Sequence, residues 1–136
     1  MVVDTSALLA ILFQEPDALA FASAIEQDSR RLLSAGSLLE TSIVTLARFG
    51  EPGERELDLM LHRAGIQIVP FGGEQVQYAR HAYCVYGKGR HPAALNFGDC
   101  FSYALSKSSR EPLLFKGVDF GKTDVLVWRS SSEGRE

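Results

Sequence analysis

Four acidic residues stand where stretches of regular structure begin or end along this chain. Asp4 follows the apolar stretch 1–3, and Asp119 comes soon after the apolar stretch 113–115. Glu40 and Asp99 lie at the start of stretches with helical spacing. Carboxylates a few ångströms apart repel strongly in a low dielectric, and a bound cation relieves that repulsion. A pocket of oxygen ligands favours Mg²⁺ or Mn²⁺, and such an ion suggests metal-assisted cleavage of a phosphodiester.

The order of apolar segments predicts how these acids would meet. Strands separated by helices favour right-handed βαβ units and a parallel sheet. The carboxyl ends of parallel strands share one edge, and ligands bind in the crevice there. We therefore expect an α/β fold, a three-layer α/β/α sandwich with a central, mostly parallel five-stranded sheet. The expected strands are 1–3, 32–35, 66–69, 113–115 and 125–128, and the expected helices are 7–13, 18–28, 38–49, 54–64, 74–86 and 96–107.

Length and composition fit one globular domain. The chain has 136 residues, of which 46% are hydrophobic and 23% charged. With 14 Lys and Arg against 17 Asp and Glu, the formal net charge is 14 − 17 = −3. This balance argues weakly against a coat protein for nucleic acid, whose affinity comes from neutralising phosphates, but it leaves a nuclease open. The expected domain is 1–129, followed by a polar tail, 130–136, that we expect to be disordered.

Compartment and membrane signals are few. The two cysteines form no CxxC pair and predict no disulfide framework. No basic leader precedes an apolar core at the start, and the longest apolar run, 7–13, is too short to span a bilayer. We expect a cytoplasmic protein without a membrane segment.

Each acid also fits a purely structural role. Asp4 could be an ordinary N-cap, Ser37 and Glu40 fit a capping box, and Asn96 could cap a helix with Asp99 in its first turn. On that interpretation the chain is a catalytically silent module that binds RNA or a partner. Ordinary caps need not gather at the carboxyl edge of the sheet, so the metal pocket is favoured, with capping as a compatible second role.

Two further segments are candidates for binding. The basic loop 87–92 carries Lys88, Arg90 and His91 just before the Asp99 helix, where they could hold a phosphate backbone, although a solvated connector is the alternative. Its GxG is too weak to indicate a phosphate loop. The apolar stripe after Asp4 could be core, or its exposed part could dock a partner helix; it comprises Leu8, Leu9, Leu12 and Phe13.

Glu40 and three segments together resemble one family. The segments 1–7, 91–104 and 113–120 are similar in order and spacing to the PIN-domain ribonuclease toxins of the VapC type. The similarity runs from about residue 1 to residue 128, and Asn96-Phe97-Gly98-Asp99 is its most specific part. It implies a Mg²⁺- or Mn²⁺-dependent endoribonuclease of a type II toxin–antitoxin pair, a homodimer, and a cognate VapB-type antitoxin.

The resemblance also implies roles for individual residues. Asp4 and Asp99 match the principal metal ligands, and Glu40 and Asp119 match the other two pocket acids. Hydroxyl positions that often line the pocket are matched by Thr5 and Ser6. Val118 departs from the family, where a polar or acidic residue often precedes the fourth acid, so Asp124 is an alternative to Asp119. Whether one or two metals act is left open.

Two other phosphate-handling classes fit less well. A doubly wound phosphatase would want a second Asp two residues after Asp4, where this chain has Ser6. A receiver domain would want a lysine beside a phospho-accepting Asp, and Lys116 is poorly placed for that role.

Overall fold

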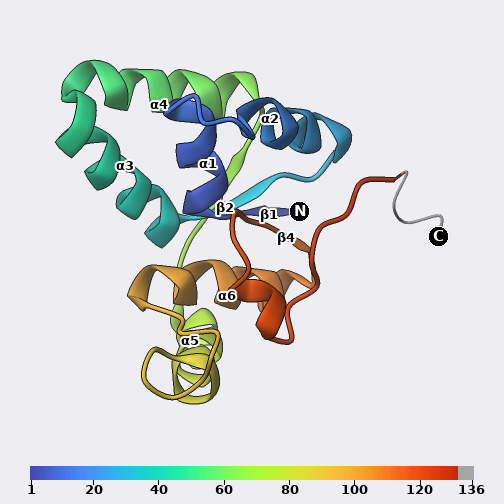
Figure 1. Cartoon of the computed structure of the whole chain (residues 1–136). Helices are drawn as coiled ribbons and strands as arrows, with labels where there is room; N and C mark the ends of the chain where they lie inside the picture. The colour runs from blue at the N-terminus through green and yellow to red at the C-terminus, as the bar shows by residue number, and fades with distance from the viewer. Residues whose placement is uncertain (132–136) are drawn as a thin grey trace.

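The computed structural model describes residues 1–131 and shows a parallel sheet between two layers of helices (Figure 1). The strands are β1 (Val2–Val3), β2 (Leu32–Ser34), β3 (Gln67–Val69) and β4 (Leu113–Leu114). The helices are α1 (Thr5–Leu12), α2 (Ala18–Gln27), α3 (Ala35–Phe49), α4 (Glu51–Arg63), α5 (Gly73–Tyr86) and α6 (Phe97–Ser109), followed by a 3₁₀ turn, η1 (Phe120–Lys122). The predicted α/β sandwich is confirmed.

The sheet has the order β3-β2-β1-β4, and neighbouring strands run parallel. The direction of strand order reverses between β1 and β4, which makes the carboxyl ends of these two strands the expected ligand crevice. The prediction of a fifth strand is wrong. Segment 125–128 forms only one parallel bridge, Leu113 to Val127. Because β4 itself has 2 residues, a ladder beside it cannot extend further.

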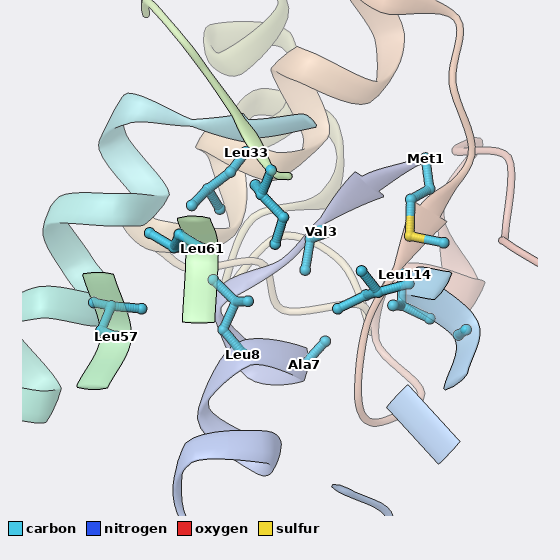
Figure 2. Close-up of a cluster of buried hydrophobic side chains, with 11 residues drawn as sticks. Met1, Val3, Ala7, Leu8, Leu33, Leu57, Leu61 and Leu114 are labelled. Carbon is cyan, nitrogen blue, oxygen red and sulfur yellow. The ribbon is translucent and has the colours of Figure 1, made fainter. Parts of the chain in front are cut away.

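Alternation along the strands divides the core into two halves. Val3, Leu33 and Leu114 face one layer of helices, where they pack with Leu8 and Leu57 (Figure 2). Their neighbours Val2, Leu32 and Leu113 face the opposite layer, in a cluster with side chains of α5 and α6. Successive side chains of a strand point to opposite faces, so three short apolar strands supply both cores. This arrangement fixes the strand ends at which the acids lie.

Helix starts differ from the sequence prediction in one place that affects the site. α3 begins at Ala35, three residues earlier than expected, because the Ser34 side chain caps it by accepting from the Gly36 N–H at 3.3 Å. Glu40 therefore lies in the second turn, and its predicted capping box with Ser37 is wrong. The predicted caps of α1 and α6 are confirmed, since Asp4 and Asn96 each accept a backbone N–H of the first turn.

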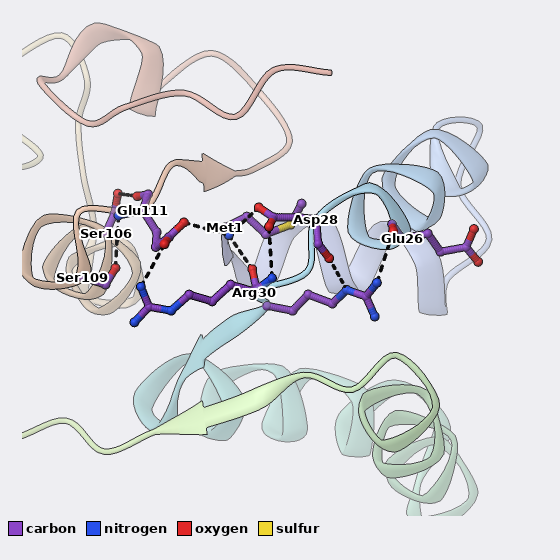
Figure 3. A network of polar contacts seen from close by, with 8 residues as sticks. Met1, Glu26, Asp28, Arg30, Ser106, Ser109 and Glu111 are labelled. Carbon is purple, nitrogen blue, oxygen red and sulfur yellow. Dashed lines mark hydrogen bonds and ion pairs between the residues drawn. The ribbon is translucent and has the colours of Figure 1, made fainter. Parts of the chain in front are cut away.

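Charged groups hold the amino ends of the strands, at the end of the sheet opposite the acids (Figure 3). The amino group of Met1 donates to Asp28 at 2.7 Å and to the Arg30 carbonyl at 2.6 Å, and it pairs with Glu111 at 3.3 Å. Burial acts to raise the pKa of Asp28, but this ammonium reverses the effect and holds that pKa below its ordinary value. The network ties the start of β1 to the segments that precede β2 and β4.

Within residues 1–131, no helix is long and apolar enough to cross a bilayer. The tail predicted at 130–136 falls mostly on residues 132–136, which lie outside the described residues.

Candidate active site

Asp4 lies at the carboxyl end of β1 and is only 4% exposed. Its Oδ2 accepts from the Ser6 N–H at 3.0 Å and from the Ser6 hydroxyl at 2.6 Å. Its Oδ1 accepts from the Ser102 hydroxyl at 2.5 Å. A buried carboxylate held by three donors is fixed in direction, and within residues 1–131 it forms no ion pair with Lys or Arg.

Asp99 occupies the first turn of α6 and takes part in a capping box. Its Oδ2 accepts from the Asn96 N–H at 2.9 Å, while its own N–H donates to Asn96 Oδ1 at 3.0 Å. Burial raises the pKa of Asp99 to about 6, and the negative charges of Asp4, Glu40 and Asp119 add to this effect. All four predicted acids therefore lie in one electrostatic neighbourhood.

Glu40 reaches this neighbourhood from α3 and packs directly against the backbone of α6. A Cβ atom at Gly98 would collide with the Glu40 carboxylate, so only glycine allows this approach. Burial raises the pKa of Glu40, the Thr5 hydroxyl opposes this shift, and the nearby Asp4 charge adds to it. The close approach explains why a glycine directly precedes Asp99.

The two candidates for the fourth acid position, Asp119 and Asp124, have different surroundings. Asp119 precedes η1 with 58% of its side chain exposed, and its charge contributes to the raised pKa of Asp99. Asp124 lies elsewhere, where it accepts from the Tyr103 hydroxyl at 2.8 Å and pairs with Lys107 at 3.0 Å. These two partners hold the pKa of Asp124 below its ordinary value, although burial opposes them. Asp124 is a structural ion-pair partner, and Asp119 is the acid beside the pocket.

A set of buried hydroxyls lies behind the acids; Thr5 was predicted, whereas Ser37, Thr41 and Ser102 were missed as hydroxyl positions by sequence reasoning. The Thr5 hydroxyl donates to the Ser37 carbonyl at 3.2 Å, and the Thr41 hydroxyl donates to the same carbonyl at 2.7 Å. Ser37 and Ser102 hydroxyls lie 3.3 Å apart, which links α3 to the residue that holds Asp4. A signal was present, because Ser37, Thr41 and Thr45 recur every four residues on a helix whose other face is apolar.

Ser6 joins the site to the segment that follows β4. While its hydroxyl donates to Asp4, the same oxygen accepts from the Lys116 N–H at 2.9 Å. The Lys116 side chain turns outward and pairs with Glu15 and with Asp17. It does not lie beside an acceptor Asp of the pocket, as a receiver domain would require.

The donor set fits a hard divalent cation in its chemistry. It consists of carboxylate and hydroxyl oxygens, without sulfur or nitrogen. Among residues 1–131, however, no group of three or more Asp, Glu, His or Cys side chains is arranged closely enough to hold a metal ion. The acids share a neighbourhood without forming a finished coordination shell.

The predicted RNA-binding residues lie near this neighbourhood. Lys88 and Arg90 are exposed on a tight turn, in which the Arg90 N–H donates to the Gly87 carbonyl at 2.9 Å. Lys88 lines the same cavity as Asn96, the residue that caps Asp99. His91 instead turns inward, where its Nδ1 accepts from the Ala93 N–H at 3.0 Å.

The apolar stripe after Asp4 divides between core and surface. Leu8 is fully buried, so it offers nothing to a partner. Leu9 is partly buried, whereas Leu12 and Phe13 line a cavity of about 440 Å³ together with Phe49 of α3.

Comparison with known families shows which family the chain belongs to. The family model of the PIN domain matches residues 1–126, nearly the whole described chain. The chain belongs to the PIN-domain family. Within it the chain belongs to the VapC ribonucleases, because it is 60% identical over 127 residues to Ribonuclease VapC30 of Mycobacterium tuberculosis, covering 93% of this chain and 97% of that protein. Ribonuclease VapC of Mycolicibacterium smegmatis is 59% identical, with 93% and 98% covered.

Solved PIN-domain structures agree with the fold. The crystal structure of Mycobacterium tuberculosis VapC20, a toxin described as cleaving the sarcin–ricin loop, matches with a TM-score of 0.75 at 15% identity and covers 95% of this chain and 98% of its own. VapBC2 from Rickettsia felis, bound to a DNA fragment from its promoter, matches with a TM-score of 0.74 at 15% identity, with 94% and 96% covered. At this identity the likeness concerns fold alone, and it confirms the PIN-like architecture expected from the sequence.

Proposed function

We propose that this chain is a divalent-metal-dependent endoribonuclease, the toxin of a type II pair, that hydrolyses RNA with Mg²⁺ or, in its place, Mn²⁺. Membership of the VapC ribonucleases supports the reaction class. The single observation that carries the site assignment is the gathering of the acids: Glu40 packs against Gly98, next to Asp99, and burial together with the charges of Asp4, Glu40 and Asp119 raises the pKa of Asp99. Among these four acids only Asp119 has an ion-pair partner within residues 1–131, Lys122 at 4.0 Å. Such a concentration of negative charge is costly for an apo fold and favours binding of a cation.

In this proposal Asp4 and Asp99 hold the metal ion. Ser102 and Ser6 keep the Asp4 carboxylate aimed out of β1, and the capping box sets the position of Asp99. When bound, the ion polarises the scissile phosphate and lowers the pKa of a coordinated water.

Glu40 is the group best suited to accept the proton of the attacking water. Its pKa is raised by burial and by Asp4, which makes it a stronger base than an ordinary carboxylate. Asp119 is more exposed, and we assign it to the rim, where it can stabilise incoming water or a second ion.

The proposal is tested by RNA cleavage with purified protein in Mg²⁺, in Mn²⁺ and in EDTA. Asp4→Asn and Asp99→Asn should each abolish cleavage while leaving the circular dichroism spectrum unchanged. Asp124→Asn is the matched control, because that acid lies outside the pocket, and it should retain cleavage. If Asp4→Asn or Asp99→Asn cleaves RNA as fast as the wild type, the replaced residue is not a metal ligand.

A catalytically silent module remains the second candidate, because Asp4 and Asp99 do cap their helices. Calorimetric titration separates the two. Heat of Mg²⁺ or Mn²⁺ binding that disappears in Asp99→Asn supports the nuclease, whereas no binding by the wild type supports the silent module.

Lys88 and Arg90 are proposed to bind the RNA backbone through charge. Their joint replacement by Ala should raise KM and reduce the salt dependence of binding, with single-turnover cleavage at saturation nearly intact. If the salt dependence of RNA binding is the same in the double variant and the wild type, the loop is only a solvated connector.

We further propose a VapB-type antitoxin as partner and a homodimer as the assembly. An amphipathic antitoxin helix could occupy the cavity lined by Leu12, Phe13 and Phe49 and extend an Arg or Lys toward the acids. Since metal and that cation would compete, saturating Mn²⁺ should weaken antitoxin binding. Equal affinity with and without Mn²⁺ would place the antitoxin outside the acidic pocket, and light scattering tests the dimer.

A further inference from the structure

An apolar cavity opens beside the acidic neighbourhood, between α5 and the start of α6. Its volume is about 730 Å³, which lies in the range of ligand pockets. Aromatic side chains form much of its wall: Phe71, Tyr83, Phe97 and Phe101. Phe97 is 79% exposed, an unusual state for a phenylalanine in a folded domain. The cavity needs an explanation that accounts for both its aromatic wall and its place next to the acids.

The aromatic wall is anchored from behind. Phe101 packs so closely against Gly36 of α3 that a Cβ atom there would collide with its ring. Phe71 and Phe97 meet that ring edge to face, with centroids 4.7 Å and 5.1 Å away. Phe101 is thereby fixed, while Phe97 stands at the cavity mouth and keeps ring surface open to solvent.

The cavity lies beside the proposed catalytic site. Asn96 lines it and accepts the Asp99 N–H at 3.0 Å, and Phe97 comes two residues before Asp99. Its wall also contains Arg80 and Lys88, and the lining residues that the structure describes include no acid. A cationic, aromatic surface thus borders an anionic pocket.

We propose that this cavity holds an unpaired base of the RNA substrate, stacked on Phe97, with an adjoining phosphate on Lys88 and Arg80. The inference rests on the proposed function and adds a substrate subsite to it. Unpaired bases stack on aromatic rings, and cationic side chains beside those rings hold the backbone. A second copy of this chain fits less well, because a two-fold contact here would bring two like-charged rims together.

The test measures binding in the Asp4→Asn background, so that RNA stays intact in Mg²⁺. Two short fluorescein-labelled single-stranded oligonucleotides are compared by anisotropy, one with bases and one abasic with the same phosphates. Phe97→Ala should weaken binding of the base-containing RNA by about 5- to 100-fold and that of the abasic strand by less than about twofold. Phe97→Trp should retain tight binding, because the larger ring stacks at least as well.

Leu19→Ala is the matched control, since Leu19 is 85% exposed and lies on α2, across the sheet from the cavity (Figure 1). It should change neither affinity. Equal losses for the two oligonucleotides, or no loss, would overturn the base site. So would a change of oligomeric mass in Phe97→Ala with both affinities unchanged, which would make the cavity an interface between copies.

These outcomes are separable from failure of the proposed function. Base-dependent binding through Phe97 in a chain whose wild type never cleaves RNA would refute the nuclease and leave the base site standing. Cleavage by the wild type with no effect of Phe97→Ala on binding would support the nuclease and refute the base site.

Discussion

Replacing Asp99 by Asn should stabilise the metal-free protein at neutral pH, although it removes a proposed metal ligand. In the folded protein the pKa of Asp99 is about 6, against an ordinary value of 3.8, because of burial first and then the charges of three other acids. The folded state therefore binds this proton more tightly than the unfolded chain does. Stability should fall as pH rises from about 4 to 6 and should stay at the lower level above that range.

The magnitude follows from the linkage between pKa and folding. At 1.36 kcal/mol for each pH unit, the difference between 3.8 and about 6 corresponds to about 3 kcal/mol at most. Asp99 keeps some contact with solvent, and screening reduces the expected gain to about 1–2 kcal/mol. The capping box survives the change, because an amide oxygen can still accept the Asn96 N–H.

The assay is urea unfolding in EDTA at pH 7.5 and at pH 4.5. Asp99→Asn should exceed the wild type in free energy of unfolding at pH 7.5, and the gap should shrink at pH 4.5, where the wild-type carboxyl is mostly protonated. Asp58→Asn, a change of an exposed acid on α4, should produce no such gap. A variant no more stable than the wild type at pH 7.5, or a gap independent of pH, would refute the reasoning.

Metal should reverse the order of the two proteins. A ligand that binds only the folded state at 100 times its Kd stabilises by about 2.7 kcal/mol. Saturating Mg²⁺ should therefore raise the unfolding free energy of the wild type and leave Asp99→Asn nearly unchanged. Equal stabilisation of both would mean that the ion binds elsewhere.

Three further predictions concern individual contacts, two beside the acids and one at the opposite ends of the strands. Ser102→Ala should lower metal affinity or cleavage by about 10- to 100-fold, because it removes a hydrogen bond that aims the Asp4 carboxylate. Ser102→Thr, which keeps a hydroxyl, should retain more of both, and equal losses in the two variants would contradict the role of the hydroxyl. Gly98→Ala should impair cleavage by displacing Glu40, whereas Gly121→Ala, which meets nothing within 4 Å, should not; equal activities would refute the close approach. Asp28→Asn should cost stability at neutral pH, and the cost should vanish as pH falls through the lowered pKa, as followed by thermal unfolding in an acid series.

Much of the fold was predictable because its signals are local. Strand and helix patterns alternate clearly, and Val2 with Val3 or Leu32 with Leu33 are apolar on both faces, as buried parallel strands must be. The fifth strand was mispredicted because Val125 to Trp128 has a strand's composition but meets a partner of only two residues. Composition reports the propensity of a segment, whereas pairing depends on the length of its neighbour.

The candidate site was predictable where chemistry lies next to an element boundary. Asp4 and Asp99 follow such boundaries, and the structure brings them together with Glu40. Ser102 was missed because its role depends on α6 crossing the end of β1, a tertiary contact between residues 98 positions apart. The choice between Asp119 and Asp124 also required tertiary information, since both follow β4 and only the fold shows Tyr103 and Lys107 beside the latter.

Helix capping and the proposed metal binding, which compete as explanations of these acids in the sequence, are compatible with each other in the structure. Asp4 caps α1 and Asp99 belongs to the capping box of α6, so both acids lie at helix N-termini. The positive end of a helix dipole lowers the cost of a nearby carboxylate, and the cap bonds fix its direction. Without these contacts, repulsion among the acids would drive the carboxylates apart toward solvent before any cation arrived. Capping thus maintains a concentration of negative charge that a divalent ion can then neutralise.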